Sequence, residues 1–133
     1  YPPEITETEA RALWVEAPPG ATFVAVNDDG AIVGTAKVGP NRPGPGAHVA
    51  TASFMVDPAR RRTGAGRALG KFALARAREN GFRAMQFNAV VTSNLPAVEL
   101  WRSLGFAIVG TVPEAFHHRD GRYVDLYVMY QRL

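Results

Sequence analysis

The chain has 133 residues, of which 47% are hydrophobic and 20% charged, and these values are typical of one globular domain over residues 1–133. No apolar run approaches the ~20 residues that span a bilayer, so no membrane partner is expected. The chain contains no cysteine, which excludes disulfides, thiolate metal sites and a cysteine nucleophile and fits a cytoplasmic location. The net charge of +3 is too small to predict a nucleic-acid partner.

The first part of the chain predicts a helix followed by a β-hairpin. Residues 6–15 combine a capping-box spacing with an apolar stripe, which predicts a helix. Residues 22–26 and 31–38 predict two strands around a tight turn. Residues 39–46 hold three prolines and three glycines, which predict a loop at the rim of a site.

Strands and a helix alternate in the middle of the chain. Residues 48–56 predict a strand, and residues 65–80 predict a helix with one apolar face. The buried stripe of that helix is predicted to be Ala68, Leu69, Phe72 and Ala73. Residues 84–91 predict the next strand, in which Asn88 is the polar residue among apolar neighbours.

A second helix and two strands complete the domain. Asn94 stands at an N-cap position, and Gly105 ends the helix. Its apolar stripe is predicted to be Ala97, Leu100, Trp101 and Leu104. Residues 106–112 and 123–130 predict two further strands around a polar loop. The hairpin predicts antiparallel pairing and the strand-helix-strand order predicts a parallel pair, so the fold class is mixed α/β.

The segment before the helix at residues 65–80 carries the most informative motif, Arg61-Arg62-Thr63-Gly64-Ala65-Gly66. A helix start offers unpaired N–H groups and the positive end of the dipole, which suit a phosphate group. Arg67 adds further positive charge. The spacing is neither a Walker loop nor a dinucleotide motif, because Leu69 stands where the third glycine would be. From spacing alone, a phosphate cradle and a plain flexible turn are equally supported.

Two motifs together resemble the GCN5-related N-acetyltransferase (GNAT) superfamily. Arg61-x-x-Gly64-x-Gly66, after a strand that ends Val56-Asp57-Pro58, is similar to its acyl-CoA signature. Later in the chain, Asn94-x-x-Ala97-x-x-Leu100-Trp101-x-x-Leu104-Gly105-Phe106 is similar to the second hallmark. The resemblance implies a central mixed sheet, flanked by helices, in which a splayed parallel pair of strands opens a wedge for acetyl-CoA.

The resemblance also implies the residues that contact acetyl-CoA. Backbone contacts to the pantetheine arm are expected from Phe54, Met55 and Val56. Pyrophosphate contacts are expected from Arg61, Arg62, Thr63, Gly64, Ala65, Gly66 and Arg67. Asn94 matches the family's usual side-chain contact to the pantetheine arm, although an N-cap role alone also explains it. The other residues predicted to line the cofactor site are Asn88, Ala97 and Trp101.

The implied activity is transfer of the acetyl group from acetyl-CoA to a primary amine of a small molecule, by direct attack on the thioester. Family members commonly donate a proton from a Tyr where this chain has Trp101, whose indole N–H is no general acid near neutral pH. Core packing is the favoured role of Trp101, because it shares the apolar stripe of Leu100 and Leu104, and lining of the cofactor arm stays open. The candidates for the proton-accepting side are His48, a titratable side chain in its strand, and Ser53, which could hold a water.

The resemblance makes expectations about the chain's start and its partners. The family fold usually begins with a strand and a helix before the helix at residues 6–15, and we expect this chain to lack both. His117 and His118 would point to opposite faces of an extended segment, so no metal site is predicted. Exposed strand edges near the C-terminus make a homodimer an open expectation.

Two further function classes stay open at this stage. The absent Tyr favours a non-catalytic domain that binds or senses acyl-CoA. A basic nucleic-acid-binding domain would use the arginine cluster and would bind with a steep salt dependence. Among these three classes, only the enzyme would release CoA when an amine is added.

Overall fold

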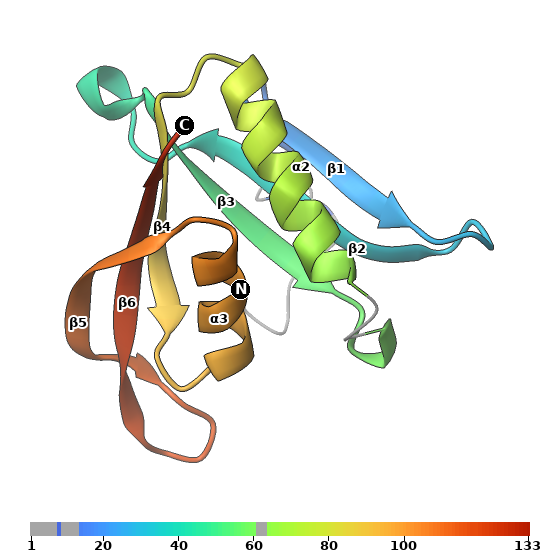
Figure 1. The fold of residues 1–133 in the computed structure, drawn as a ribbon. Helices are drawn as coiled ribbons and strands as arrows, with labels where there is room; N and C mark the ends of the chain where they lie inside the picture. The colour runs from blue at the N-terminus through green and yellow to red at the C-terminus, as the bar shows by residue number, and fades with distance from the viewer. Residues whose placement is uncertain (1–7, 9–13, 61–63) are drawn as a thin grey trace.

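The computed structural model describes residues 8, 14–60 and 64–133, and these form a six-stranded mixed sheet with the order β1-β2-β3-β4-β6-β5 (Figure 1). The strands are β1 (Ala21–Val26), β2 (Ile32–Pro40), β3 (Val49–Val56), β4 (Ala84–Val91), β5 (Ala107–His117) and β6 (Tyr123–Arg132). The helices are α2 (Ala65–Glu79) and α3 (Leu95–Ser103), with short 3-10 helices η1 (Gly44–Gly46) and η2 (Pro58–Arg60). The predicted helix at residues 6–15 lies mostly outside the described residues.

Both kinds of strand pairing that the sequence predicts are present. β1 and β2 form the antiparallel hairpin, and β3 and β4 are parallel and connected through α2. The other neighbouring pairs, β2 with β3, β4 with β6 and β5 with β6, are antiparallel. The predicted mixed α/β fold class is confirmed.

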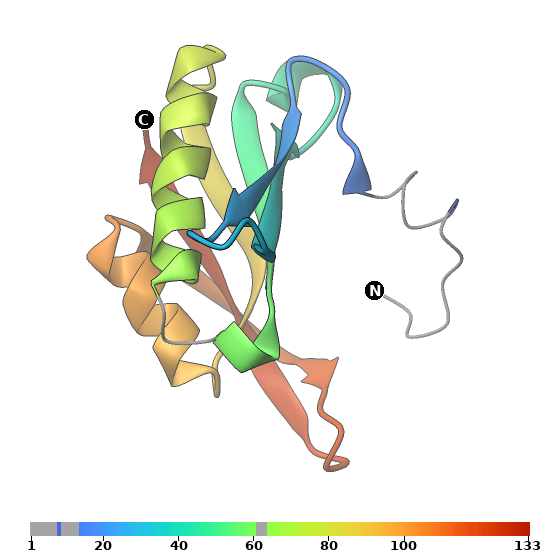
Figure 2. The same ribbon diagram turned by 90° about the vertical axis from the view of Figure 1, so that its right-hand side faces the viewer.

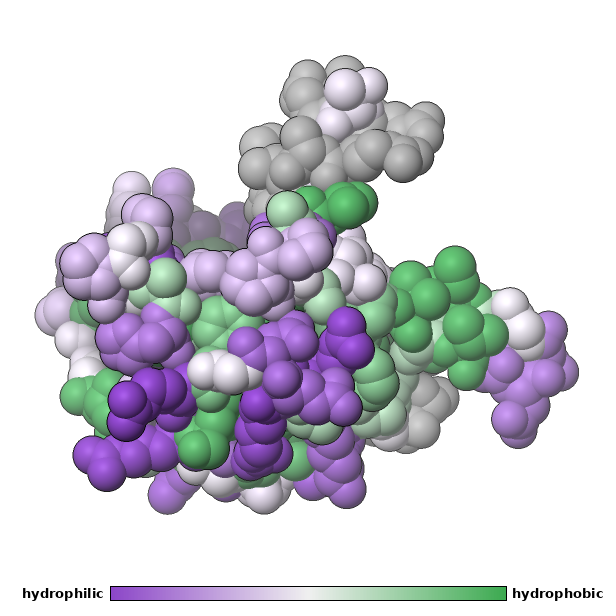
Figure 3. Space-filling view, turned by 90° about the horizontal axis from the view of Figure 1, so that it is seen from above, coloured by the Kyte–Doolittle hydropathy of each residue, from purple (hydrophilic) through white to green (hydrophobic). Residues whose placement is uncertain are grey.

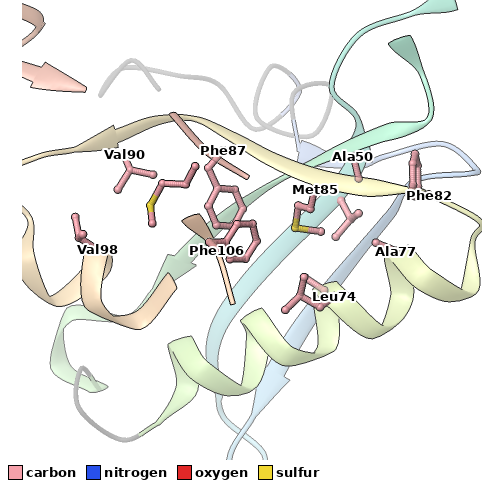
Figure 4. Close-up of a cluster of buried hydrophobic side chains, with 12 residues drawn as sticks. Ala50, Leu74, Ala77, Phe82, Met85, Phe87, Val90, Val98 and Phe106 are labelled. Atoms are coloured by element: carbon pink, nitrogen blue, oxygen red, sulfur yellow. The ribbon is translucent and has the colours of Figure 1, made fainter. Parts of the chain in front are cut away.

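Helices α2 and α3 lie on the same face of the sheet (Figure 2). Between them and the sheet is a core in which Met85 of β4, Met129 of β6 and Ala73 of α2 have no exposed surface (Figure 4). Because side chains alternate along a strand, the neighbours of Met85 and Met129 point to the opposite face of the sheet. The two faces therefore differ, and one of them has no described helix over it.

The buried stripe of α2 differs from the predicted one. Leu69 and Ala73 are buried as predicted, but Ala68 and Phe72 are exposed. The buried positions are Ala65, Leu69, Gly70, Ala73, Leu74 and Ala77. The predicted stripe is rotated around the helix by about one residue from the observed one. Phe72 was included in it because its side chain is large and apolar. Its ring instead meets the edge of Phe23 of β1, with centroids 4.7 Å apart.

Gly70 of α2 lies close to the side chains of Trp101 in α3 and of Leu104 just after it. A Cβ atom at Gly70 would lie 2.8 Å from Leu104 Cδ1 and 3.0 Å from Trp101 Cζ3, which is too close. At Gly66, in the same helix, a Cβ atom would meet only Leu100 Cδ2, at an ordinary 3.6 Å. Packing therefore disfavours a side chain at Gly70, whereas there is room for one at Gly66.

We expect alanine to have opposite effects on stability at these two glycines. Gly→Ala in a helix gains up to about 1 kcal/mol of helix propensity, and overpacking costs about 1–3 kcal/mol. Gly66→Ala should therefore stabilise the fold, whereas Gly70→Ala should lower the free energy of unfolding by about 1 kcal/mol. Urea denaturation of both variants measures this, and a stabilised Gly70→Ala variant would contradict the close helix contact.

Several strand boundaries differ from the predicted ones. β2 continues to Pro40, so the loop predicted at residues 39–46 begins later and contains η1. β3 begins at Val49, one residue after His48. β5 continues to His117, through residues predicted as a polar loop. The cause is an irregular register against β6, in which Glu114 has a φ of 51°, and such an irregularity breaks the alternating pattern that identifies a strand.

The turn between β5 and β6 is ordered by Asp120. Its carboxylate accepts hydrogen bonds from the backbone N–H of Arg122 at 3.0 Å and from the Arg122 Nε at 2.7 Å. The backbone bond and the guanidinium bond hold the pKa of Asp120 below its usual range. The carboxylate is therefore ionised at neutral pH, and it orders the turn in that form.

Two surface features bear on possible partners. In the described part of the chain, no helix is long and apolar enough to cross a membrane. The edge strand β5 exposes Ile108, Val109, Val112 and Phe116. The homodimer expected from such an edge stays a prediction.

Candidate functional site

β3 and β4 diverge soon after they begin. In the described structure they pair at Val49 with Ala84 and at Ala50 with Met85, and at no later position. Against β6, the register of β4 shifts between Phe87 and Val90, which leaves one extra residue in β4. Such a bulge bends its strand and removes backbone groups from the ladder. The bend separates β4 from β3 and opens the sheet.

The opened space is a slot of about 500 Å³ between the two strands. It is lined by Thr51, Ala52, Ser53 and Phe54 of β3, by Phe87, Asn88, Ala89, Val90 and Val91 of β4, and by Asn94, Ala97 and Trp101 at α3. Ala52 and Phe54 pack against the core on the helix face. Thr51 and Ser53 alternate with them and point to the other face. The slot therefore has walls from both faces of the sheet, and two molecules could meet in it from opposite sides.

Trp101 closes the slot on the helix side. Its ring lies 4.9 Å from the Phe54 ring of β3 and 4.8 Å from the Phe87 ring of β4, between centroids. Phe87 in turn stacks on Phe106, with centroids 4.3 Å apart. Trp101 thus joins the two diverging strands through one aromatic cluster. It packs as predicted, and it also lines the slot.

Polar amides lie where the slot faces away from the helices. The Asn88 Oδ1 accepts a hydrogen bond from Gln86 Nε2 at 2.9 Å, and the Asn88 Nδ2 donates to Asn41 Oδ1. This amide chain (Asn41, Gln86 and Asn88) links the end of β2 to β4. Asn88 was predicted as a site residue, whereas Asn41 and Gln86 were not. Asn41 lies in the predicted rim loop, and this position was the signal that could have identified it.

The N-terminus of α2 follows the end of β3, after η2. Gly64 is its N-cap residue and has a φ of 86°, which favours glycine. The first turn of α2, which lies wholly within the described residues, holds no acidic side chain. Its N–H groups at Ala65, Gly66 and Arg67 are those that a helix leaves unpaired, and they suit an anion. The predicted contacts Arg61, Arg62 and Thr63 lie outside the described residues.

Arg67 connects the beginning of α2 to the end of α3. Its Nη2 donates a hydrogen bond to Ser103 Oγ at 2.9 Å, and Ser103 Oγ donates to the Leu100 carbonyl at 2.7 Å. Arg67 was predicted to contact pyrophosphate, and its guanidinium has further donors beyond the one used here. The contact holds the two sequence motifs next to each other.

Asn94 caps α3 and also lies in the lining of the slot, and its contact with the pantetheine arm stays a prediction. Its side chain accepts a hydrogen bond from the Ala97 backbone N–H at 3.3 Å, which confirms the N-cap of α3. The same residue lines the slot together with Ala97.

The remaining predicted site residues divide between the slot and other places. Ser53 and Phe54 line the slot, whereas Met55 and Val56 lie beyond its lining, and the Met55 side chain is half exposed. His48 does not line the slot either, and it belongs to a separate pocket. Some slot-lining residues were not predicted, because nothing in the sequence marks the position at which β3 leaves β4. They are Thr51 and Ala52 of β3 and Phe87, Ala89, Val90 and Val91 of β4.

The comparison with protein families agrees with this geometry. The family model described as "Acetyltransferase (GNAT) family" matches residues 1–106 of the chain. The chain belongs to the GNAT family. N-acetyltransferase aca1 of Schizosaccharomyces pombe is 33% identical over 98 residues, which make up 73% of this chain and 47% of aca1. The chain therefore spans about half the length of this curated relative.

Solved structures extend the similarity to the fold. A GCN5-related N-acetyltransferase from Kribbella flavida is 56% identical, with a TM-score of 0.95, over 100% of this chain and 80% of that one. A GNAT superfamily phosphinothricin acetyltransferase from Sinorhizobium meliloti, solved in complex with AcCoA, is 25% identical. Its TM-score is 0.84, over 96% of this chain and 68% of that one. The mixed sheet with a splayed parallel pair is thus the GNAT fold.

Proposed function

We propose that this chain is an acetyl-CoA-dependent N-acetyltransferase that acetylates a primary amine of a small molecule. The observation that carries the proposal is the slot between β3 and β4, which has walls from both faces of the sheet. A two-substrate transfer needs both reactants to meet at one point, and a slot of this kind lets each reactant enter from its own side. Acetyl-CoA is the co-substrate of the GNAT family, and it supplies an activated acetyl group.

The described residues fit acetyl-CoA in three ways. The edge of β3 that faces β4 has no strand partner from Thr51 to Phe54 in the described structure, whereas the opposite edge pairs with β2. The backbone groups on the β4 side can therefore pair with the amides of the pantetheine arm. Trp101 offers an aromatic surface beside that edge. The N-terminus of α2 at Gly66 offers N–H groups and a positive dipole end for the pyrophosphate.

Residues on the other face would handle the amine. In the transfer, a bond forms between the amine nitrogen and the acetyl carbon, and the carbon–sulfur bond breaks to release the CoA thiolate. The amine loses one proton, and the thiolate takes up one proton to become the CoA thiol. Ser53 points to this face and could hold the water that accepts that proton. The bulge around Asn88 releases backbone N–H groups next to the slot, which could donate to the developing charge on the acetyl oxygen.

The decisive experiment measures thiol release from acetyl-CoA in the presence of a panel of primary amines, with CoA binding measured in parallel. We expect release with at least one small amine and none without amine. CoA binding without release for any amine would favour the alternative function, a domain that binds or senses acyl-CoA. That alternative has one observation in its favour, the indole of Trp101 at the position where the family commonly has a Tyr.

Replacement of Asn88 should separate transfer from stability. Asn88 is exposed, so Asn88→Ala should change the free energy of unfolding by less than about 0.5 kcal/mol. Loss of the Asn88 amide from the slot lining, together with its hydrogen bond to Asn41, should cost about 1–2 kcal/mol in transfer, which is roughly a tenfold lower kcat/KM. Steady-state kinetics with the best amine of the panel measure this. Thr111→Ala on the edge strand β5 is the control, and an equal loss in both variants would contradict the role of Asn88.

A further inference from the structure

A second pocket, of about 690 Å³, lies at the end of the sheet opposite to the N-terminus of α2. It is formed where β3 and β4 begin and β6 ends. We call it the basic pocket, and its lining residues are His48, Val49, Arg83, Ala84, Tyr130 and Arg132. Backbone bonds hold it together, from Arg83 N–H to the His48 carbonyl at 2.9 Å and from Leu133 N–H to the Arg83 carbonyl at 3.0 Å.

The side chains that line the basic pocket include basic groups and no acidic group. His48, Arg83 and Arg132 contribute nitrogen donors, Tyr130 contributes a phenol, and none of the lining residues is acidic. Among the described residues, no carboxylate lies within ion-pair distance of Arg83 or Arg132. The end of the molecule that carries the basic pocket is rich in hydrophilic residues (Figure 3). Two arginines in the lining of a pocket whose lining residues include no acidic side chain are suited to binding an oxyanion of a ligand.

The basic pocket opens on the face from which the amine would enter the slot. Met85 and Met129 point into the helix-covered core, so Ala84, Gln86, Tyr130 and Arg132 point to the other face. Ala84 pairs with Arg132, and Gln86 pairs with Tyr130. Along β4, the same face then continues from Gln86 to Asn88 of the slot, and the two side chains are hydrogen-bonded. The amide chain therefore forms a polar path between the basic pocket and the slot.

We propose that the basic pocket binds a carboxylate or phosphate group of the acceptor whose primary amine reacts in the slot. The inference rests on the proposed function and adds a substrate class to it. Ala84 and Asn88 are four residues apart on one strand, which corresponds to ~13 Å, and arginine side chains reduce the span to be bridged. The acceptor should therefore carry its amine and its oxyanion on the order of 10 Å apart, about the length of an extended tripeptide.

The first test compares triglycine with triglycinamide, which differ in the terminal carboxylate. We expect kcat/KM for triglycine to exceed that for triglycinamide at least tenfold, and added salt to reduce the ratio. The Arg83→Gln/Arg132→Gln double variant should bring the ratio close to one and leave kcat/KM for triglycinamide within about twofold. Arg78→Gln/Arg76→Gln, in the last turn of α2, removes the same charge elsewhere and should keep the ratio.

A length series sharpens this test. Diglycine is too short to bridge the slot and the basic pocket. The ratio of kcat/KM for diglycine to kcat/KM for diglycinamide should therefore be smaller than the corresponding ratio for triglycine. If acetyl transfer occurs but kcat/KM is equal for acid and amide at every length, the basic pocket does not bind an oxyanion of the acceptor. The proposed function would not be affected by that result. A triglycinephosphonate analogue in place of the acid distinguishes a carboxylate site from a phosphate site.

A binding measurement keeps the inference testable if no peptide is acetylated. Triglycine is titrated into the CoA-saturated protein, and backbone amide signals are followed by NMR. We expect shifts at Val49, Ala84 and Arg132 that are absent with triglycinamide and in the double variant. Absent or identical shifts would overturn the inference. Such shifts without thiol release for any amine would support the basic pocket and count against the enzyme.

Discussion

Replacement of Trp101 with alanine is expected to cause a large loss of stability. Its ring contacts those of Phe54 and Phe87, which belong to the two diverging strands. Loss of a buried Trp side chain costs about 3–5 kcal/mol, and because Trp101 is only partly buried we expect about 3 kcal/mol. For a domain of this size that corresponds to a fall in the melting temperature of roughly 10 °C. Calorimetry measures it directly.

The same substitution should also weaken acetyl-CoA binding. Trp101 forms one wall of the slot, and without it β3 and β4 lose the aromatic cluster that sets their separation. Trp101→Phe keeps an aromatic ring and should recover more than half of both losses. If the Trp101→Ala variant has an unchanged melting temperature and an unchanged affinity for acetyl-CoA, the ring does not set the separation of β3 and β4.

A tyrosine at this position tests the missing proton donor. Trp101→Tyr should retain most of the stability, because the ring still packs on Phe54 and Phe87. The indole of Trp101 does not ionise near neutral pH, so the parent protein should show no basic limb due to residue 101 in its pH–rate profile. The tyrosine variant should gain such a limb near the pKa of a phenol. An unchanged profile would mean that residue 101 does not approach the leaving thiolate.

Gly66→Asp should have opposite effects on the free protein and on its affinity for acetyl-CoA. Gly66 is in the first turn of α2, where a carboxylate interacts favourably with the helix dipole by about 0.3–1 kcal/mol. A Cβ atom fits there, because its nearest neighbour would be Leu100 Cδ2 at 3.6 Å. The same carboxylate would repel a pyrophosphate at the helix start by about 2 kcal/mol, even at high dielectric constant. We therefore expect a slightly more stable protein with roughly 30-fold weaker binding.

Gly66→Asn is the matched control, because it has the same shape without the charge. Its affinity should lie between those of the parent and the aspartate variant, and only the aspartate variant should become less defective at high salt. Isothermal titration with CoA, combined with thermal melting of the free protein, provides both quantities. If both variants bind CoA as tightly as the parent, the pyrophosphate does not bind at the N-terminus of α2.

Much of the fold could be predicted from neighbouring residues alone. The N-cap at Asn94, the end of α3 at Gly105 and the parallel pair around α2 follow from capping, glycine conformation and strand-helix order. These are local properties, and each depends on residues a few positions apart. The family resemblance was carried by two such local segments, around Gly64 and Asn94, which explains why it was visible without a structure.

The slot and the basic pocket exist only in the tertiary structure, because each is formed by segments that are far apart in the sequence. The slot exists because β4 gains one residue against β6 and leaves β3, and a register depends on the partner strand as well as on the strand itself. The requirement for glycine at Gly70 comes from Trp101, about thirty positions later in the chain. Nothing in the sequence marks His48, Arg83 and Arg132 as one group, and they line one pocket only because three strand ends meet there. Contacts between distant segments depend on how the elements pack, and no short stretch of this sequence contains that information.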